Sequence, residues 1–570
     1  MAVMENTDFP HVELAIKDDL AKVDTIGKVF LSKLCSYPDK TFLKYKKYGS
    51  FRNISFDETF SSMRSLYIQL CDLGLTKGDR VLFISENRQQ LITAALGTAL
   101  SGFVSVPVHS GYTGTQIQEI IDNCRPKCII ISDDKQLEKL DNIKNTAIIS
   151  FESLSKEILY YKDIVKKYKN SNIDYGKVVC EVHPDNLAYI LYQNNEKGKL
   201  EGVKLFHNNI LSLVKHAYKE TGMINSNDTI LFNLPFTLIG GIFEIHLSLY
   251  SSAVCAIADD TEINILLENL KEVDASIFSS TPNVWKKFFD KFIQFQDKEN
   301  PELLFRATIG ESLKKGFCWG IFKNNSVVEF FNDLDLDIIQ FYGFAETSGP
   351  YAYLKSDKKK LKSFTNIEIK AEKDSEILVK RENILTGNID NEKSLINNWF
   401  KTGDIGTVDE DGNVQIHGRK GDYITLLSGY KISPQKIESL ISSKFVSKVV
   451  IVGEKKEFLS ALVVPNIDYL KEYAHEELKI RYKTIDELIK DRWVKALYRL
   501  IFENLNKELA VFEKIKGFTI LSSPFSVDSM ELTPMGKPIR EIINVKRSHE
   551  IDSIYKAPFS KLLFETNTDK

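Results

Sequence analysis

The feature of this sequence that most constrains its fold is a repeated alternation of short apolar runs with helical segments. The runs are rich in β-branched residues, and helical segments such as 89–101 and 116–123 separate them. They occupy positions 80–84, 104–108, 128–132, 187–191, 229–232, 276–279 and 338–341. Such alternation is typical of βαβ units, whose parallel strands are buried on both faces of a sheet. The sequence therefore predicts a large α/β body with parallel-sheet subdomains.

A different pattern begins near residue 364. Segments 367–371, 376–381 and 414–417 resemble short strands, and Asp411-Gly412 is typical of a tight turn between antiparallel strands. These signals predict a small antiparallel β subdomain over about 364–418.

Beyond Arg419 the pattern changes again. Two apolar runs, near 449–453 and 460–465, precede a long charged helical stretch from about 467 to 509. This combination predicts a smaller α+β domain. The expected division is a large domain over 1–420 and a small C-terminal domain over 421–570.

Composition excludes several classes of function. The net charge of −3 gives no electrostatic reason to expect binding to nucleic acid or to an acidic membrane surface. The only close cysteine pair, Cys124 and Cys128, has no histidine cluster nearby, which argues against a zinc site. Dispersed cysteines suit a reducing compartment, and residues 1–20 lack the apolar core of a signal peptide. We therefore expect a cytoplasmic protein.

Two apolar stretches, 91–108 and 233–258, have the length of membrane spans. The first is interrupted by Gly97, Gly102 and Pro107, while the second carries Glu244 and His246. We predict that each is a buried helix leading into a buried strand.

Three local motifs indicate chemistry. The first, F-Y-G-F-A-E-T-S-G-P at 341–350, ends a predicted strand and then presents Glu346. Ligands of open α/β sheets bind at the carboxyl ends of the strands. The alternative is a surface loop with a solvated glutamate.

The second motif places T-G-D, ending at Asp404, about fifteen residues before Gly418-Arg419. An aspartate accepts hydrogen bonds from both hydroxyls of a ribose, and an arginine donates to them. The third motif, E-L-T-P-M-G-K-P-I-R at 531–540, holds Lys537 in a loop flanked by proline and glycine. Domain movement can deliver such a lysine to a site, although an isolated lysine is more often simply exposed.

In this order the three motifs resemble those of the adenylate-forming superfamily of acyl-CoA synthetases, luciferases and peptide-synthetase adenylation domains. Further segments are similar to the long-chain fatty acyl-CoA synthetase and bubblegum-type branch. They are T-P-N-V-W-K-K at 281–287, the segment 135–140, and L-A-V-F-E-K-I-K at 509–516. The resemblance covers nearly the whole chain.

The resemblance implies an ATP-, Mg²⁺- and coenzyme A-dependent ligase that joins a fatty acid to coenzyme A through an acyl adenylate. It implies that Glu346 holds the magnesium ion, that Tyr342 and Gly343 line the adenine, and that Asp404 and Arg419 hold the ribose.

By the same resemblance, Lys537 bridges the carboxylate and the α-phosphate, and Gly429 lies on the coenzyme A path. Gly198 and Gly202 stand where the phosphate-binding loop has its glycines. The acyl pocket is expected between segments 234–241 and 341–344.

The phosphate-binding loop departs from the family pattern, which reads roughly T-S-G-T-T-G-x-P-K-G. Here 193–202 reads Q-N-N-E-K-G-K-L-E-G, so the hydroxyls are missing and Glu201 stands at the lysine position. A carboxylate facing a triphosphate is repulsive. Two further changes also remove polar groups that the family pattern has: Ala345 replaces a threonine, and Leu238 replaces a histidine.

Three functions therefore stay open. The chain is a fatty acid–CoA ligase, a non-catalytic protein that binds adenylate or fatty acid, or a ligase that passes its acyl adenylate to a carrier protein. Peripheral membrane contact is left open because long acyl substrates partition into bilayers, but the sequence shows no strong amphipathic anchor. The sequence does not indicate an oligomeric state.

Overall fold

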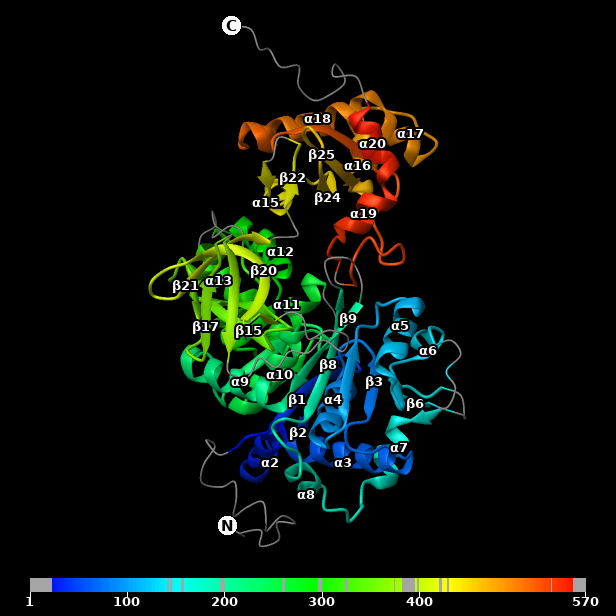
Figure 1. The fold of residues 1–570 in the computed structure, drawn as a ribbon, viewed down its shortest axis with the longest axis vertical. Coiled ribbons are helices and arrows are strands. Elements are labelled where there is room, and N and C mark those ends of the chain that lie inside the picture. Colours follow the sequence, from blue (N-terminus) through cyan, green and yellow to red (C-terminus); the bar gives the residue numbers. More distant parts are fainter. Residues whose placement is uncertain are drawn as a thin grey trace.

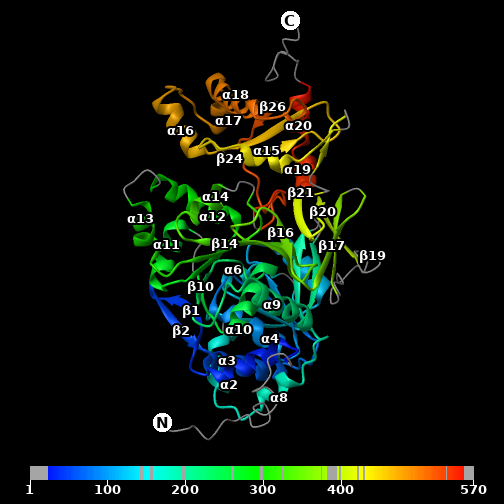
Figure 2. The same ribbon diagram turned by 90° about the vertical axis from the view of Figure 1, so that its left-hand side faces the viewer.

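The structure is a computed structural model, and it comprises a large body and a smaller one (Figure 1). It describes residues 23–140, 143, 146–154, 158–194, 200–258, 262–295, 300–322, 326–373, 375–381, 395–396, 399–419, 423–427, 430–534 and 536–556. The predicted fold class is confirmed: a large N-terminal α/β body with parallel sheets carries a smaller C-terminal α+β body. Figure 2 shows the small body standing over one end of the large one.

The first sheet has seven strands in the order β7-β6-β5-β3-β4-β8-β9. All neighbours are parallel except β8 and β9, which form an antiparallel hairpin. The strands are β3 (Arg80–Ile84), β4 (Val104–Val108), β5 (Cys128–Ile131), β6 (Ala147–Ser150), β7 (Leu159–Tyr160), β8 (Leu187–Asn194) and β9 (Leu200–Phe206). The runs predicted at 80–84 and 104–108 agree with β3 and β4 at both ends.

The second sheet has 14 strands within the described residues. Its parallel part joins β14, β13, β12, β10, β11 and β1, and β2 pairs with β1 at the edge. These strands are β1 (Thr41–Lys47), β2 (Ser50–Ser55), β10 (Thr229–Phe232), β11 (Val254–Ile257), β12 (Ile277–Ser280), β13 (Lys315–Trp319) and β14 (Asp337–Phe344).

The predicted antiparallel strands continue this second sheet and do not form a separate one. Hydrogen bonds run from β14 to β15 and β16, and then through β21 and β20 to β18 and β17. The strands are β15 (Gly349–Leu354), β16 (Leu361–Ser363), β17 (Ile367–Ala371), β18 (Glu376–Arg381), β19 (Leu395–Ile396), β20 (Trp399–Val408) and β21 (Asn413–Arg419). One continuous sheet therefore links the two motifs at 341–350 and 402–419.

Helices pack the two sheets into one apolar core. α4 (Gln89–Leu100) contacts β3, β4 and β8 of the first sheet and β1 of the second. The other helices of the large body are α2 (Ile26–Ser36), α3 (Phe56–Asp72), α5 (Gly114–Cys124), α6 (Asp134–Leu137), α7 (Tyr161–Tyr168), α8 (Tyr175–Cys180), α9 (His207–Thr221), α10 (Ile239–Ser251), α11 (Ile263–Glu272), α12 (Pro282–Phe292), η2 (Ile293–Phe295), α13 (Pro301–Ile309) and α14 (Ser326–Asn332).

Both stretches of membrane-span length are buried helix–strand units, as predicted: α4 leads to β4, and α10 leads to β11. No helix in the described part of the chain is both long and apolar enough to cross a membrane. Glu244 on α10 accepts hydrogen bonds from the Ser279 hydroxyl at 2.5 Å and from the Trp319 indole at 3.2 Å. Complete burial outweighs these bonds and raises the pKa of Glu244 to about 8.

The small body is built on the sheet β24-β25-β26, with strands β24 (Val446–Val452), β25 (Leu459–Pro465) and β26 (Ile515–Ile520). A two-stranded sheet, β22 (Ile424–Thr425) and β23 (Lys431–Ile432), precedes it. The helices are α15 (Pro434–Leu440), α16 (Ile467–Glu476), α17 (Ile485–Lys490), α18 (Arg492–Lys507), η4 (Val511–Glu513), α19 (Arg540–Lys546) and α20 (Ser548–Tyr555).

The helical stretch predicted from about 467 to 509 consists of three separate helices, α16, α17 and α18. Lys479 adopts a positive φ of 52°, which a continuous helix cannot contain. Thr484 and Asp491 then act as N-caps, accepting from the backbone N–H groups of Glu487 and Trp493. A capping side chain starts a new helix by satisfying its first donors.

Candidate active site

The carboxyl end of β14 carries Tyr342, Gly343 and Glu346 on a fixed turn into β15. Thr347 holds this turn, since its hydroxyl accepts from the Phe344 N–H at 3.0 Å and donates to the Gly349 carbonyl at 2.7 Å. Glu346 is half-buried on this turn. Glu346 therefore lies on a turn, as in the alternative interpretation, but its side chain is only partly exposed.

Gly343 is required by the close approach of β15. A Cβ atom at this position would lie 2.3 Å from the Gly349 carbonyl oxygen and 2.5 Å from the Pro350 Cα. The rings of Tyr342 and Phe344 flank this contact, with centroids 5.7 Å apart. The glycine of the motif thus has a packing role that does not depend on any ligand.

Asp404 and Arg419 face each other across the β20–β21 hairpin. The two residues are register partners, and the Arg419 Nε donates to the Asp404 Oδ1 at 3.1 Å. The Asp404 side chain is fully buried, whereas that of Arg419 is 30% exposed. Their separation in the sequence is therefore a consequence of hairpin pairing, and the arginine keeps access to a ligand.

Tyr342 joins this pair to the β14 motif. Burial raises the pKa of Asp404, while Arg419 and the hydroxyls of Tyr342 and Tyr351 oppose that rise. The Arg419 guanidinium also lies 4.4 Å from the centroid of the Phe344 ring. The structure thus brings Tyr342, Asp404 and Arg419, predicted from two distant motifs, into one site.

Gln193 connects the end of β8, in the first sheet, to Glu346 at the end of β14, in the second. Its Nε2 donates to the Glu346 Oε1 at 2.5 Å. Sequence reasoning assigned no role to Gln193, and the only signal was its place at the end of a predicted strand. The carboxyl ends of both sheets therefore meet at Glu346.

The altered loop leaves β8 next to this contact. Glu201 on β9 is the cross-strand partner of Gln193, and Gly202 pairs with Tyr192. Side chains of cross-strand partners lie on the same face of a sheet. Glu201 therefore lies on the face from which Gln193 reaches Glu346. Gly198 and the rest of 195–199 lie outside the described residues, as do Gly421 and Gly429.

Lys537 stands on a short hairpin of the small body, formed around a bridge between Leu532 and Pro538. The Thr533 N–H donates to the Lys537 carbonyl at 2.8 Å, and the Lys537 N–H donates to the Thr533 hydroxyl at 3.1 Å. Lys448 fixes the tip by donating from Nζ to the Gly536 carbonyl at 2.6 Å. The Lys537 side chain is exposed on this rigid support.

This hairpin approaches the large body just beyond the carboxyl end of β4. A Cβ atom on Gly111 would lie 3.7 Å from the Pro534 Cβ, and Asp528 exerts a coulombic pull on Lys139. The hairpin of Lys537 thus lies near the carboxyl end of β4, the strand next to β8.

A magnesium ion fits the donor at Glu346. Mg²⁺ in nucleotide sites uses one or two carboxylates together with substrate phosphates and water. Among the residues that the structure describes, no group of three or more His, Cys, Asp or Glu side chains is arranged to hold a metal.

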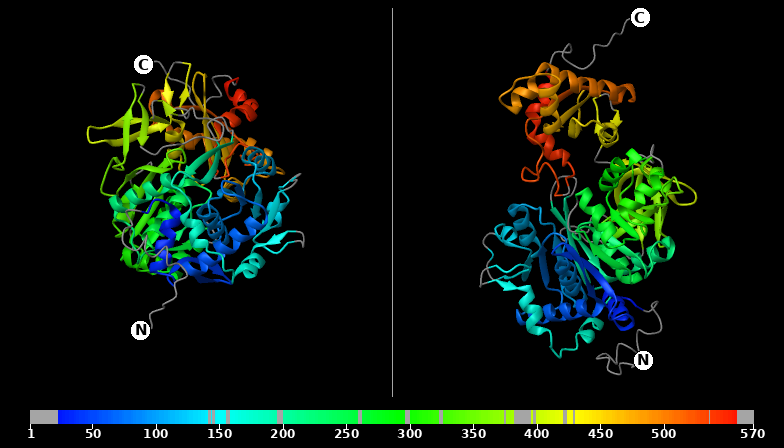
Figure 3. Two further views of the ribbon diagram at one scale, coloured as in Figure 1. Left: turned by 60° about the horizontal axis from the view of Figure 1, so that its bottom comes forward. Right: turned by 180° about the vertical axis from the view of Figure 1, so that it is seen from behind.

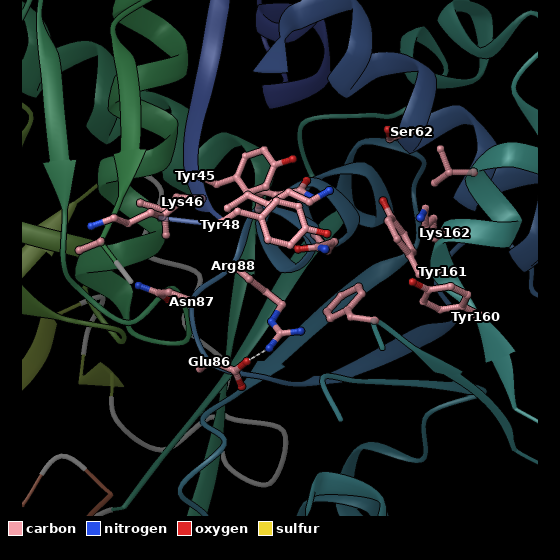
Figure 4. Close-up of a pocket in the computed structure, with 17 residues that line it drawn as sticks. Tyr45, Lys46, Tyr48, Ser62, Glu86, Asn87, Arg88, Tyr160, Tyr161 and Lys162 are labelled. Carbon is pink, nitrogen blue, oxygen red and sulfur yellow. Dashed lines mark hydrogen bonds and ion pairs between the residues drawn. The ribbon is translucent and has the colours of Figure 1, made fainter. Parts of the chain in front are cut away.

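A separate cavity of about 700 Å³ opens between the β1–β2 hairpin and the ends of β3, β6 and β11 (Figure 4). Arg88 crosses it and forms an ion pair with Glu86. Lys46, on the opposite wall, donates to the Asn269 Oδ1 at 2.7 Å. None of the predicted site residues lines this cavity, so we assign it no part in the nucleotide site.

The chain belongs to the AMP-binding enzyme family. The model of that family matches residues 32–380, and the model of the AMP-binding enzyme C-terminal domain matches residues 421–558. The predicted resemblance to the adenylate-forming superfamily is thereby confirmed.

Curated relatives belong to the long-chain fatty acid branch. The chain is 22% identical to the long-chain-fatty-acid–CoA ligase FadD15 of Mycobacterium bovis, over 89% of this chain and 93% of that protein. It is also 22% identical to the human long-chain-fatty-acid–CoA ligase ACSBG2, over 93% of this chain and 92% of the relative. Among solved structures, the anthranilate CoA ligase AuaEII in complex with anthranoyl-AMP superposes with a TM-score of 0.72 at 15% identity, covering 93% and 98% of the two chains.

Proposed function

We propose that this protein ligates a long-chain fatty acid to coenzyme A, using ATP and forming an acyl adenylate on the way. One observation carries the proposal: Tyr342, Asp404 and Arg419 converge beside Glu346 at the carboxyl ends of the strands. These groups are the right types for an adenosine and its phosphates, and relatives named as long-chain-fatty-acid–CoA ligases support the substrate class.

In the first half-reaction a carboxylate oxygen of the fatty acid attacks the α-phosphorus, and the bond to pyrophosphate breaks. Both reactants are negative, so positioning and positive charge provide most of the catalysis. Asp404 accepts from the ribose hydroxyls and Arg419 donates to them, while Tyr342 and Gly343 border the adenine. Glu346 would hold a magnesium ion, which would supply positive charge to the phosphates.

Lys537 is the proposed mobile cation of this step, bridging the attacking carboxylate and the α-phosphate. In the second half-reaction the coenzyme A sulfur attacks the acyl carbon, and the bond to AMP breaks. We propose that Gly429 borders the path of coenzyme A. This scheme divides the chain into a domain over 1–420, with its β subdomain at about 364–418, and a lid domain over 421–570.

A second candidate function is the binding of adenylate or fatty acid without turnover. The Gln193 amide occupies an oxygen of Glu346, and Glu201 stands across the strand from Gln193. Both features disfavour a triphosphate, because they reduce metal binding and add negative charge. A third candidate, transfer of the acyl adenylate to a carrier protein, differs only in the acceptor.

Product analysis separates the three candidates. The protein is incubated with ATP, Mg²⁺ and palmitate, acyl-AMP and pyrophosphate are measured by mass detection, and coenzyme A is then added. Acyl-AMP followed by acyl-CoA supports the proposal. Acyl-AMP that persists after coenzyme A is added points to a carrier protein. Neither product, from protein that still binds AMP, contradicts both ligase candidates and supports the binding role.

A further inference from the structure

The outer face of α18 exposes two large apolar side chains to solvent. Trp493 is 53% exposed and Leu500 is 55% exposed, and they stand two helical turns apart. Beyond the end of the helix, Val511 is 78% exposed. Figures 1 and 3 show α18 along the side of the small body that points away from the large body.

The opposite face of α18 holds the helix rigidly. Val494, Tyr498 and Phe502 are fully buried, and the Tyr498 hydroxyl donates to the Phe445 carbonyl at 2.7 Å. Asn506 exchanges two hydrogen bonds of 2.8 Å with the backbone of Ile515 on β26. Because this buried face fixes the orientation of α18, Trp493 and Leu500 on the other face point to solvent.

Basic residues outnumber acidic ones along α18. Within α18 the four bases outnumber the single acid, Glu503, so the helix carries a net charge of 4 − 1 = +3 in a chain whose net charge is −3. The Arg492 guanidinium lies 5.1 Å from the centroid of the Trp493 ring. The bases are Arg492, Lys495, Arg499 and Lys507.

We propose that this face of α18 docks the protein on an anionic lipid surface. Helices that lie in a membrane interface combine Trp and Leu on one side with Lys and Arg beside them. Protein interfaces are depleted in lysine at their centre, although Trp and Arg are enriched there. Leu303 and Leu304, at 64% and 38% exposure on α13, show that exposed apolar residues also occur elsewhere. α18 differs from α13 because its exposed apolar residues occur together with an excess of basic residues on the same helix.

The docking surface does not depend on the proposed ligase activity, because it shares no residue with the candidate site. A lipid surface would nevertheless supply a ligase with its substrate, since long-chain fatty acids partition into bilayers. α18 belongs to the same small body as the Lys537 hairpin, so docking leaves the large body facing away from the lipid.

Binding to vesicles tests the proposal directly. Full-length protein is sedimented with vesicles of phosphatidylcholine alone or with added phosphatidylserine, at low and high salt. We expect binding only to the anionic vesicles and release by salt. Replacing Trp493→Ala and Leu500→Ala together should weaken binding at least ten-fold. Replacing Arg492→Gln and Arg499→Gln should weaken it about five-fold per charge.

Matched controls make the result specific. Leu303→Ala removes a similarly exposed apolar side chain from the large body and should bind vesicles as wild type does. Tryptophan emission should shift to shorter wavelength on vesicle binding in the wild type, and Trp493→Phe should remove that shift. Ligation of a soluble short acid should be unchanged in all α18 variants.

Three outcomes overturn the proposal. In the first, the wild type does not bind anionic vesicles. In the second, the Trp493/Leu500 and Arg492/Arg499 double variants bind vesicles as the wild type does. In the third, these variants lose self-association while their binding to vesicles stays the same. The last would assign the face to a protein partner. Vesicle binding without any ligase activity would keep this proposal and defeat the proposed function.

Discussion

At the scale of single residues, the proposed nucleotide site depends most on Asp404. The Asp404→Asn variant keeps the shape of the side chain but removes the charge that accepts from the ribose hydroxyls. Charge-assisted hydrogen bonds contribute about 1.5–3 kcal/mol each, so we expect AMP affinity to fall about ten- to a hundred-fold by calorimetry. The control ligand is 2′,3′-dideoxy-AMP, which should lose little affinity. Equal losses for both nucleotides would contradict a ribose contact.

Glu201 tests whether the altered loop hinders the triphosphate. A carboxylate about 4 Å from a phosphate charge costs a few kcal/mol at an effective dielectric of about 20. Glu201→Lys should therefore increase ATP affinity at least ten-fold and leave AMP affinity unchanged, because AMP lacks the β- and γ-phosphates. Titrating ATP and AMP into the wild type and into Glu201→Lys measures the four affinities. An unchanged or weaker affinity for ATP would show that Glu201 does not face the phosphates.

Glu244 makes stability depend on pH in a direction opposite to that of an ion-paired acid. Its folded pKa of about 8 lies above the ordinary value of 4.5, so the native state holds a proton that the unfolded chain has lost between these two pH values. Stability contributed by this group therefore falls as pH rises from 4.5 to 8, by on the order of 3 kcal/mol at pH 7.

Thermal unfolding of the Glu244→Gln variant tests whether the stability contributed by Glu244 falls as pH rises. The variant should gain melting temperature relative to wild type at pH 8, and the gain should shrink towards pH 5. Glu531 is a control with the opposite sign, because its ion pair with Arg547 holds the pKa of the carboxyl low. Glu531→Gln should lose more melting temperature at pH 8 than at pH 4. A pH-independent effect at Glu244 would contradict its protonation in the native state.

At the scale of elements, the sequence predicts strands better than helix ends. β3, β4, β10, β17 and β18 have the predicted bounds, because each is a short run rich in apolar residues, continuous or alternating. The helix ends within 467–509 are harder to predict, because charged residues continue through the breaks between α16, α17 and α18. Only the capping roles of Thr484 and Asp491 mark the new helix starts.

The β14–β15 turn gives a prediction at this scale. Gly343→Ala places a methyl group where the Gly349 carbonyl oxygen would be 2.3 Å away, so the two strands must separate. We expect a loss of AMP binding together with a lower melting temperature. Gly412→Ala is the comparison, because its Cβ would meet no atom within 4 Å and its cost is limited to a φ of 77°. Normal AMP binding by Gly343→Ala would show that the turn does not position the site.

At the scale of the whole molecule, the sequence predicts residues of the candidate site but not how they meet. Tyr342, Asp404 and Arg419 were found from motifs, and their convergence needed the pairing of distant strands. The contact between Gln193 and Glu346 joins two separate sheets, and no local pattern encodes such a contact. The continuity of the second sheet into the antiparallel strands was hidden for the same reason.

The arrangement of the two bodies leads to the central claim, that the small body brings Lys537 to the reacting phosphate. Its hairpin already faces the strand ends near Gly111. A lysine acting only in the adenylation step contributes nothing to the binding of AMP alone. Lys537→Ala should therefore keep AMP affinity and stability while losing turnover.

The most direct measurement is acyl-CoA formation by mass detection from ATP, Mg²⁺, coenzyme A and fatty acids of 8 to 20 carbons. Wild type is compared with Lys537→Ala and with Lys546→Ala, a lysine of the same body on α19. The account predicts product from wild type and Lys546→Ala and a loss on the order of a hundred-fold in Lys537→Ala. No acyl-CoA from folded wild type at any chain length, or equal rates in all three proteins, would contradict it.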